Sequence, residues 1–435
     1  MKTNWIVAGL LLFSLSGWAQ EKPAVWDLRS CIEYAREQNI QIRKSRVALE
    51  ESLENTKEAK AQRLPSLSFS SAHNYVNRPR PEAGDKNSYS GSYDLSSSVS
   101  LYQGGKLKMN LQQMDLKNQV QELTIKESEN NIELAITQAF IQVLYAHESV
   151  KINANTVEVS KAQRDRGKEL MNAGSLSKAD FAQLESQYTS DKYQLVVAQS
   201  SLANAQLELK QLLELGINDT MELKVPELQD ESVLTLLPSK ESVYMTSLGI
   251  MPEVKYNQLS INLASIEKAK AWAGYLPTLR LSAGLGTSHA SGNSWSSQVR
   301  QNWSENIGLS LSIPIFSNRS VKTAVNVAKL NIENAELNYE GVQKDLLKSV
   351  ETVYQDAVSA QDRFRSAKEN LNSVELSFQL IQEQFFLGMK NTLEMLTEKN
   401  NLLSAQLEVI QAKYMAILNQ QLLNFYQGKE IGLGN

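Results

Sequence analysis

The sequence contains an internal repeat, which limits the chain to folds built from two similar halves. Pro65 and Pro277 occupy the same place in two matching Leu-Pro segments, each followed by alternating apolar and polar residues. Three pairs of segments correspond in the same order: 59–70 with 271–282, 101–106 with 315–320, and 172–180 with 386–394. A chance match would not keep its register over three landmarks. The chain is therefore predicted to hold one structural repeat at 20–240 and a second at 241–435.

Each half contains two short segments in which apolar and small polar residues alternate. Leu67 and Phe69 share one face of the first segment, and Leu95, Val99 and Leu101 share one face of the next, opposite a row of serines. Such alternation is typical of strands with one apolar face. It predicts four strands, at about 66–76, 90–101, 278–288 and 305–315. Their length and one-sided pattern suit the lipid-facing wall of a β-barrel with a wet interior.

Two long segments link these strand pairs to the glycines Gly174 and Gly388. They run from about Lys106 to Asn172 and from about Ser320 to Leu387, with no proline or other strong helix breaker. At 1.5 Å per residue each could form a helix of roughly 100 Å, a length that a compact globular domain does not need. Each glycine is predicted to be the turn of an antiparallel helical hairpin, since a left-handed residue closes a helix there.

The segments that follow the two glycines have a heptad seam. A narrow seam kept over several turns predicts helices packed side by side, with polar faces on both sides. Asp191 and Asn400 interrupt the seams; they either set the register of the helices or face a pore. The seam residues are Phe181, Leu184, Tyr188, Asp191, Leu195, Ala198, Leu202, Ala205, Leu209 and Leu212, then Leu393, Leu396, Asn400, Leu403, Leu407, Ile410, Tyr414 and Ile417.

The N-terminus has the order of a secretory signal peptide. Lys2 precedes an apolar run from Ile6 to Leu15 and small residues that end at Ala19, so a signal peptide is predicted at 1–19. The formal net charge is -4 without a basic block, which argues against a nucleic-acid partner. The single cysteine, Cys31, allows no disulfide within the chain.

The residues give no sign of catalysis or of a bound cofactor. His73, His147 and His289 are dispersed along the sequence, away from any second ligand at metal-binding spacing. We interpret them as surface or loop residues and expect no catalytic, cofactor-binding or metal-binding residue and no enzyme activity. The sequence also lacks a GxxxxGK[ST] phosphate-binding loop, so the energy for any transport is expected from a partner protein.

The order of the elements resembles a known family. Helix, Leu-Pro, two strands, long helix, glycine turn and helix occur twice behind a signal peptide, which is similar to the TolC-like outer membrane efflux proteins (outer membrane factors). The resemblance covers essentially the whole mature chain. It implies a mainly α fold with a transmembrane β-barrel contribution, in which coiled helical hairpins form an α-barrel. Four strands cannot close a barrel without leaving edges unpaired in lipid, so a homotrimer with a twelve-stranded barrel is expected.

The resemblance also implies a function. It predicts a duct in the outer membrane of a Gram-negative bacterium, embedded in outer-membrane lipid, with its helical barrel in the periplasm. The implied partners are a periplasmic membrane fusion (adaptor) protein and an inner-membrane pump of RND or ABC type. Small-molecule efflux is the first expectation and type I protein secretion is the alternative. A periplasmic adaptor or a coiled-coil structural protein fits less well, because strand pairs recur twice between the helices.

In that family, charged residues close to the periplasmic turns hold the helices closed. Five residues of this chain match the turns and the charged positions beside them. Gly174 and Gly388 match the turns, Asp180 and Glu394 match acids six residues beyond them, and Lys390 matches a base. The gate hypothesis is a bridge between Asp180 and Lys390 of neighbouring hairpins, which would stabilise closure by at most about 1 kcal/mol. The alternative is that these charged residues cap helices or lie on a solvated face.

Overall fold

The computed structural model describes residues 25–80, 86–226, 230, 233–292 and 294–433, and the predicted signal peptide at 1–19 lies outside them. These residues are mainly helical with four strands, as predicted. The strands are β1 (Ser66–Asn77), β2 (Asn87–Gln103), β3 (Thr278–Ala290) and β4 (Ser304–Ser312). The helices are α1 (Leu28–Gln38), α2 (Ile40–Ala61), α3 (Lys106–Asn172), α4 (Lys178–Leu212), α5 (Lys240–Ile250), α6 (Pro252–Trp272), α7 (Trp295–Gln301), α8 (Ser320–Phe386) and α9 (Thr392–Tyr426), with a 3-10 turn η2 (Ala273–Tyr275).

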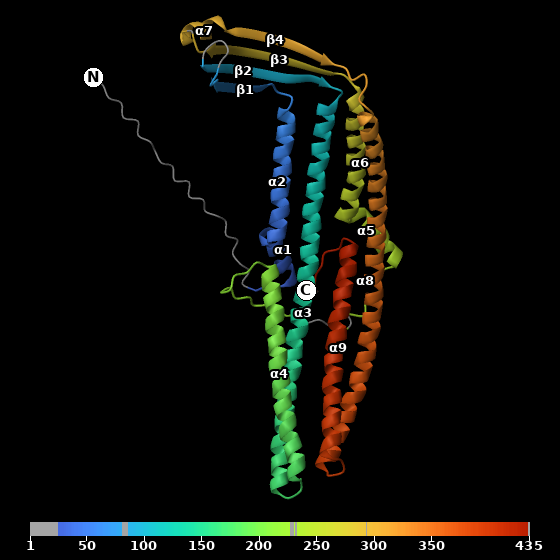
Figure 1. Ribbon diagram of the computed structural model, residues 1–435. Coiled ribbons are helices and arrows are strands. Elements are labelled where there is room, and N and C mark those ends of the chain that lie inside the picture. The colour runs from blue at the N-terminus through green and yellow to red at the C-terminus, as the bar shows by residue number, and fades with distance from the viewer. Residues whose placement is uncertain (1–24, 81–85, 227–229, 231–232, 293, 434–435) are drawn as a thin grey trace, which may run out of the picture.

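The molecule is elongated, with the sheet at one end and two hairpin turns at the other (Figure 1). The helices α3 and α8 have 67 residues each and run the whole way between these ends. Two shorter helices lie end to end along each of them: α2 and α4 along α3, and α6 and α9 along α8. Among the described residues, no helix has the length and the apolar run that a membrane crossing needs.

The helices pack through narrow stripes, as their heptad spacing predicts. In α4 the buried residues Leu184, Asp191, Ala198 and Ala205 follow one another at steps of seven. The main apolar core lies where the hairpins meet the α1, α5 and linker segments, and Trp26, Phe140 and Phe364 are each 1% exposed or less there. Among the described residues the larger apolar core thus lies at mid-length, and thinner seams run towards the tips.

The four strands form one antiparallel sheet in the order β1-β2-β3-β4. The strands of the first half pair with those of the second through β2 and β3, while β1 and β4 are the two edges. Leu67 and Phe69 on β1 and Ile307 and Leu309 on β4 are all more than 60% exposed on one face. A single copy therefore presents an apolar face and two unpaired strand edges.

The first helical segment differs from the sequence prediction. The sequence predicts a helical segment from about Leu28 to Leu64 that ends at Pro65, and the structure divides this segment into α1 and α2 at Asn39. The Asn39 side chain accepts a hydrogen bond from the amide of Gln41 at 2.9 Å and donates one to the carbonyl of Leu212 at 3.1 Å. Because Asn39 caps a new helix and also hydrogen-bonds to a second element, the helix is interrupted at this residue.

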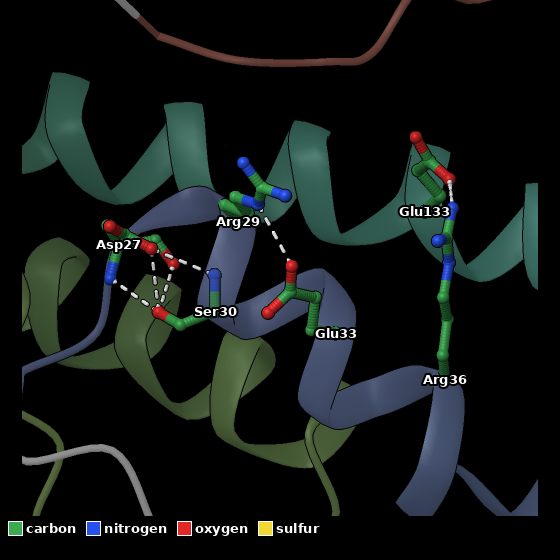
Figure 2. A network of polar contacts seen from close by, with 6 residues as sticks. All are labelled: Asp27, Arg29, Ser30, Glu33, Arg36 and Glu133. Carbon is green, nitrogen blue, oxygen red and sulfur yellow. Dashed lines mark hydrogen bonds and ion pairs between the residues drawn. The ribbon is translucent and has the colours of Figure 1, made fainter. Parts of the chain in front are cut away.

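Polar contacts cap α1 and join it to α3 through the pair of Arg36 and Glu133 (Figure 2). Asp27 caps α1, because its side chain accepts from the amide of Ser30 at 2.8 Å, and this bond lowers the pKa of the Asp27 carboxyl. At the other end of α1, the Arg36 guanidinium donates to the Glu133 carboxylate of α3 at 2.6 Å. The N-terminal helix is thereby held on the long helix at mid-length of the molecule.

The linker between α4 and α5 is docked on the second hairpin. Asp230 forms ion pairs with Lys368 of α8 at 2.8 Å and with Lys413 of α9 at 2.9 Å. The Gln361 side chain of α8 donates to the carbonyls of Val233 and Thr235. Hydrogen bonding to Lys368, and then to Lys413, lowers the pKa of Asp230 from its usual 3.8.

We expect Asp230→Asn to loosen this linker at neutral pH, because it removes a charge shared by two lysines. The measurement is limited proteolysis, which should cleave the variant faster within residues 213–239. The control is Asp362→Asn, which removes an exposed ion pair on α8. A depressed folded-state pKa contributes stability above the unfolded value and loses it as the pH falls through the folded value. Wild-type protection should therefore be unchanged between pH 7 and pH 5. Equal cleavage of both variants would contradict the docking role.

Candidate functional site

The two hairpin turns have the same backbone structure. Gly174 and Gly388 have φ values of 79° and 75° in the left-handed region that glycine adopts without strain. In each turn the amide after the glycine donates to the carbonyl five residues earlier, at 2.9 Å after Gly174 and 2.8 Å after Gly388. This pattern closes the last turn of a helix and satisfies its free carbonyls. The two turns therefore end α3 and α8 in the same way.

Asp180 lies in the first turn of α4, next to the cap of that helix. The Ser177 hydroxyl accepts from the amide of Asp180 at 3.0 Å and donates to its carboxylate at 2.6 Å. A carboxylate in the first turn also interacts favourably with the helix dipole. Within one chain, Asp180 is thus part of a helix cap and remains partly exposed to solvent.

Glu394 belongs to the matching cap of α9 and also pairs with Lys390. Asn391 and Glu394 make a capping box, and the Lys390 ammonium lies 2.8 Å from the Glu394 carboxylate. This hydrogen bond with Lys390, followed by the one from the Asn391 amide, lowers the pKa of Glu394. In a single chain Lys390 therefore pairs with Glu394. A bridge from Lys390 to Asp180 stays a hypothesis about neighbouring copies.

A buried ion pair joins the two hairpins further from the turns. Lys399 of α9 contacts the carboxylate of Asp191 of α4, and both side chains are 3% exposed. Gln187 donates to Asp191 at 2.9 Å and to Asn400 at 3.2 Å. Burial lowers the pKa of the Lys399 ammonium, while the hydrogen bond and the charge of Asp191 oppose that shift. The heptad pattern identified Asp191 and Asn400 as exceptions but missed Lys399.

Apolar residues pack between the same two hairpins, on the side of the ion pair that is nearer to the turns. Leu184 of α4 and Met395 of α9 are 1% and 0% exposed, and Phe385 and Leu396 complete the cluster. A Cβ on Gly167 of α3 would lie 2.3 Å from the Leu184 side chain, so a larger residue there would force the buried Leu184 side chain to shift. We call Leu184, Asp191, Met395 and Lys399 the inter-hairpin contact. It holds the two hairpins together a short distance from their tips.

Comparisons with known proteins match nearly the whole chain. The family model described as Outer membrane efflux protein matches residues 31–214 and residues 247–429. Outer membrane protein TolC of Escherichia coli is 24% identical over 419 residues, covering 94% of this chain and 84% of that protein. Toxin and drug export protein A of Aggregatibacter actinomycetemcomitans is 21% identical, covering 90% and 83%.

The fold has been solved before in a similar protein. The structure of CusC, described by its conformational changes accompanying folding and transmembrane channel formation, superposes with a TM-score of 0.79 at 17% identity. The match covers 97% of this chain and 96% of that one. At this identity the likeness concerns the fold.

We expect Lys399→Met to destabilise the protein by about 3–5 kcal/mol, because it leaves the Asp191 carboxylate buried without its partner. Asp191→Leu/Lys399→Met should recover most of that loss, since apolar side chains of similar volume often replace a buried pair at little cost. Thermal unfolding followed by the helical signal measures both. Lys161→Met, at an exposed position of α3, is the control. A double variant no more stable than the single one would contradict this account.

Proposed function

The chain belongs to the outer membrane efflux protein family and is an exit duct of the outer membrane, and we propose that it serves a tripartite efflux system that passes small molecules out of a Gram-negative cell. One observation carries the proposal. A sheet with an exposed apolar face and two continuous helical hairpins belong to the same chain, at opposite ends of one long body. A body of this shape can cross an outer membrane at one end and reach deep into the periplasm at the other.

Three copies would complete the duct. The free edges β1 and β4 of one sheet are different strands, so copies related by rotation can pair β1 of one with β4 of the next and close a ring. Closure removes every unpaired edge, which lipid requires. The exposed apolar residues, such as Phe69 and Leu309, would then face lipid. The long helices would continue the ring as a tube.

The hairpin tips would meet the partner proteins. We place Gly174 and Gly388 at the periplasmic end, where an adaptor and an inner-membrane pump of RND or ABC type would engage them. The sequence similarity to Toxin and drug export protein A supports two kinds of cargo, since that name includes both a toxin and drugs. Type I protein secretion is therefore the second candidate function. Loss of resistance to small toxic compounds in a deletion strain, with protein secretion unchanged, would support efflux.

The charged residues near the tips would form the gate. Asp180 and Lys390 are both partly exposed, so each could exchange its partner in the same chain for one on a neighbouring copy. An exposed pair stabilises closure by at most about 1 kcal/mol. Three such pairs in a trimer would limit the open fraction by at most about 100-fold, a barrier that contact with an adaptor can overcome.

We predict a small conductance for the purified wild-type protein in a planar bilayer and a rise of up to about 100-fold for Asp180→Ala/Lys390→Ala, because the closed state loses its bridges. Glu54→Ala/Lys57→Ala removes an exposed pair on α2 and serves as the control. A rise with Glu394→Gln but not with Asp180→Ala would assign the gate to the pair within one hairpin. Absence of any current from folded trimers of all variants would refute the duct.

A further inference from the structure

The apolar face of the sheet has a groove in its middle. Side chains of register partners point to the same face of a sheet, and one row of partners crosses all four strands: Leu67, Ser97, Ala283 and Ile307. The small residues Ser97 and Ala283 lie in the middle of this row, between larger side chains at the two edges. Together with Leu95 and Leu285 of the next row, they line an open groove of about 550 Å³.

Beyond the groove, the side chains on this face become polar and aromatic. The row of Leu285 ends at Glu305 on β4, and the row after it consists of Ser71, Tyr93 and Thr287. Aromatic residues with a polar group are typical of the level at which an outer-membrane barrel meets the lipid headgroups. From Leu279 to His289 the strand rises about 34 Å, which is about 24–28 Å of height at a tilt of about 35–45°. This height matches the lipid-facing band of such barrels.

Helix α7 lies against the same face at this level, at the end of the sheet farthest from α3 and α8 (Figure 1). Thr287, whose side chain is on the apolar face, donates to the carbonyl of Val299 at 2.6 Å. The ring of Trp295 makes an edge-on contact with the ring of His289, which is on that face too. The Gln298 side chain makes two hydrogen bonds to the backbone of β3, at 2.7 Å and 2.8 Å. The helix is therefore fastened to the side of β3 that would face lipid.

The exposed residues of α7 and of the segment after it suit a lipid headgroup. Arg300 lies about 200° around the helix from the buried Gln298, so its exposed guanidinium is on the side away from the sheet. A guanidinium binds phosphate through two parallel hydrogen bonds. Trp295 and Trp303 are 55% and 54% exposed, and indole rings favour the boundary between hydrocarbon and headgroups. Trp303 Nε1 donates at 2.9 Å to Glu305, whose carboxylate lines the groove and can accept further hydrogen bonds.

We propose that this surface binds one phosphorylated glycolipid of the outer leaflet, of the lipid A type, on each chain. An acyl chain lies in the groove over Ala283, the sugar lies beside Trp303 and Glu305, and a phosphate binds Arg300. A phospholipid carries its phosphate next to its acyl chains, where Glu305 would repel it. A glycolipid instead places sugar hydroxyls at that level, and these can donate to the carboxylate. The order of groove, acid and base therefore matches the order of acyl chain, sugar and phosphate in this lipid.

The inference rests on the proposed duct in one respect, because it is the closed ring of copies that turns the apolar face towards lipid. The two proposals can nevertheless fail separately. A folded protein that conducts ions in a bilayer but binds no glycolipid would leave the duct intact and refute the lipid site. A folded protein that binds the glycolipid but conducts no ions would support the lipid site and refute the duct.

The test is native mass spectrometry of the full chain in detergent, titrated with diphosphorylated lipid A. We expect saturation at one lipid per chain. Arg300→Gln should weaken binding by at least about 10-fold, and so should removal of the lipid's phosphates, because either change removes a charge-assisted hydrogen bond. Ala283→Phe should also weaken binding, because its ring would fill the groove. The control is Arg280→Gln, the same substitution at an exposed position on the opposite face of β3, which should leave binding unchanged.

Three results would overturn the proposal. The first is the absence of saturable lipid A binding to the folded wild-type protein. The second is equally tight binding of phosphatidylglycerol, which would mean that the surface accepts any anionic lipid. The third is wild-type affinity of Arg300→Gln for lipid A. Circular dichroism verifies that each variant is folded; if Ala283→Phe is not, Arg300→Gln and the lipid without phosphates decide the question.

Discussion

The structure depends on covering two very long helices with neighbours. A helix of 67 residues cannot bury a stripe against itself, and most helical stability in proteins comes from packing of an apolar face. Here α2 and α4 share the length of α3, and α6 and α9 share that of α8, so each long helix has a partner at every level. The break at Asn39 and the docked linker around Asp230 lie at mid-length, where these shorter helices meet. The core is concentrated there because the helices of the hairpins, the short helices α1 and α5 and the linker converge at that level.

The same constraint extends beyond one chain. Along α2, Val47 and Leu53 remain exposed at 62% and 44%, and the sheet keeps two open edges. The exposed residues of α2 and the open sheet edges both need a neighbouring chain to cover them. A ring of copies would supply a neighbour on each side. The helical tube and the β-barrel would close together, because each chain contributes long helices to the tube and strands to the barrel.

Local features were predicted from the sequence, and contacts between distant segments were not. Gly174 and Gly388 could be recognised as turns because a left-handed φ is a property of one residue and its neighbours. The ends of α3 follow from the absence of breakers between Lys106 and Asn172. Lys399 was missed because it lies beside the heptad seam, and only the packing of α9 on α4 buries it. His73 and His289 were interpreted as surface or loop residues, but strand pairing through β2 places them on β1 and β3 with ring centroids 6.2 Å apart, and His289 is buried.

The polar contacts near the tips differ greatly in strength, and this difference bears on how a duct of this kind would open. The exposed pair of Lys390 and Glu394 contributes little and can be exchanged for other partners. The buried pair of Lys399 and Asp191 cannot be separated without leaving two charges in an apolar environment. Asp180 and Asp191 stand about 16 Å apart along α4. If the tips move, the short segment beyond the inter-hairpin contact is the part free to do so, while that contact keeps the two hairpins of one chain moving as a unit. Opening would then separate neighbouring chains rather than the hairpins within one chain.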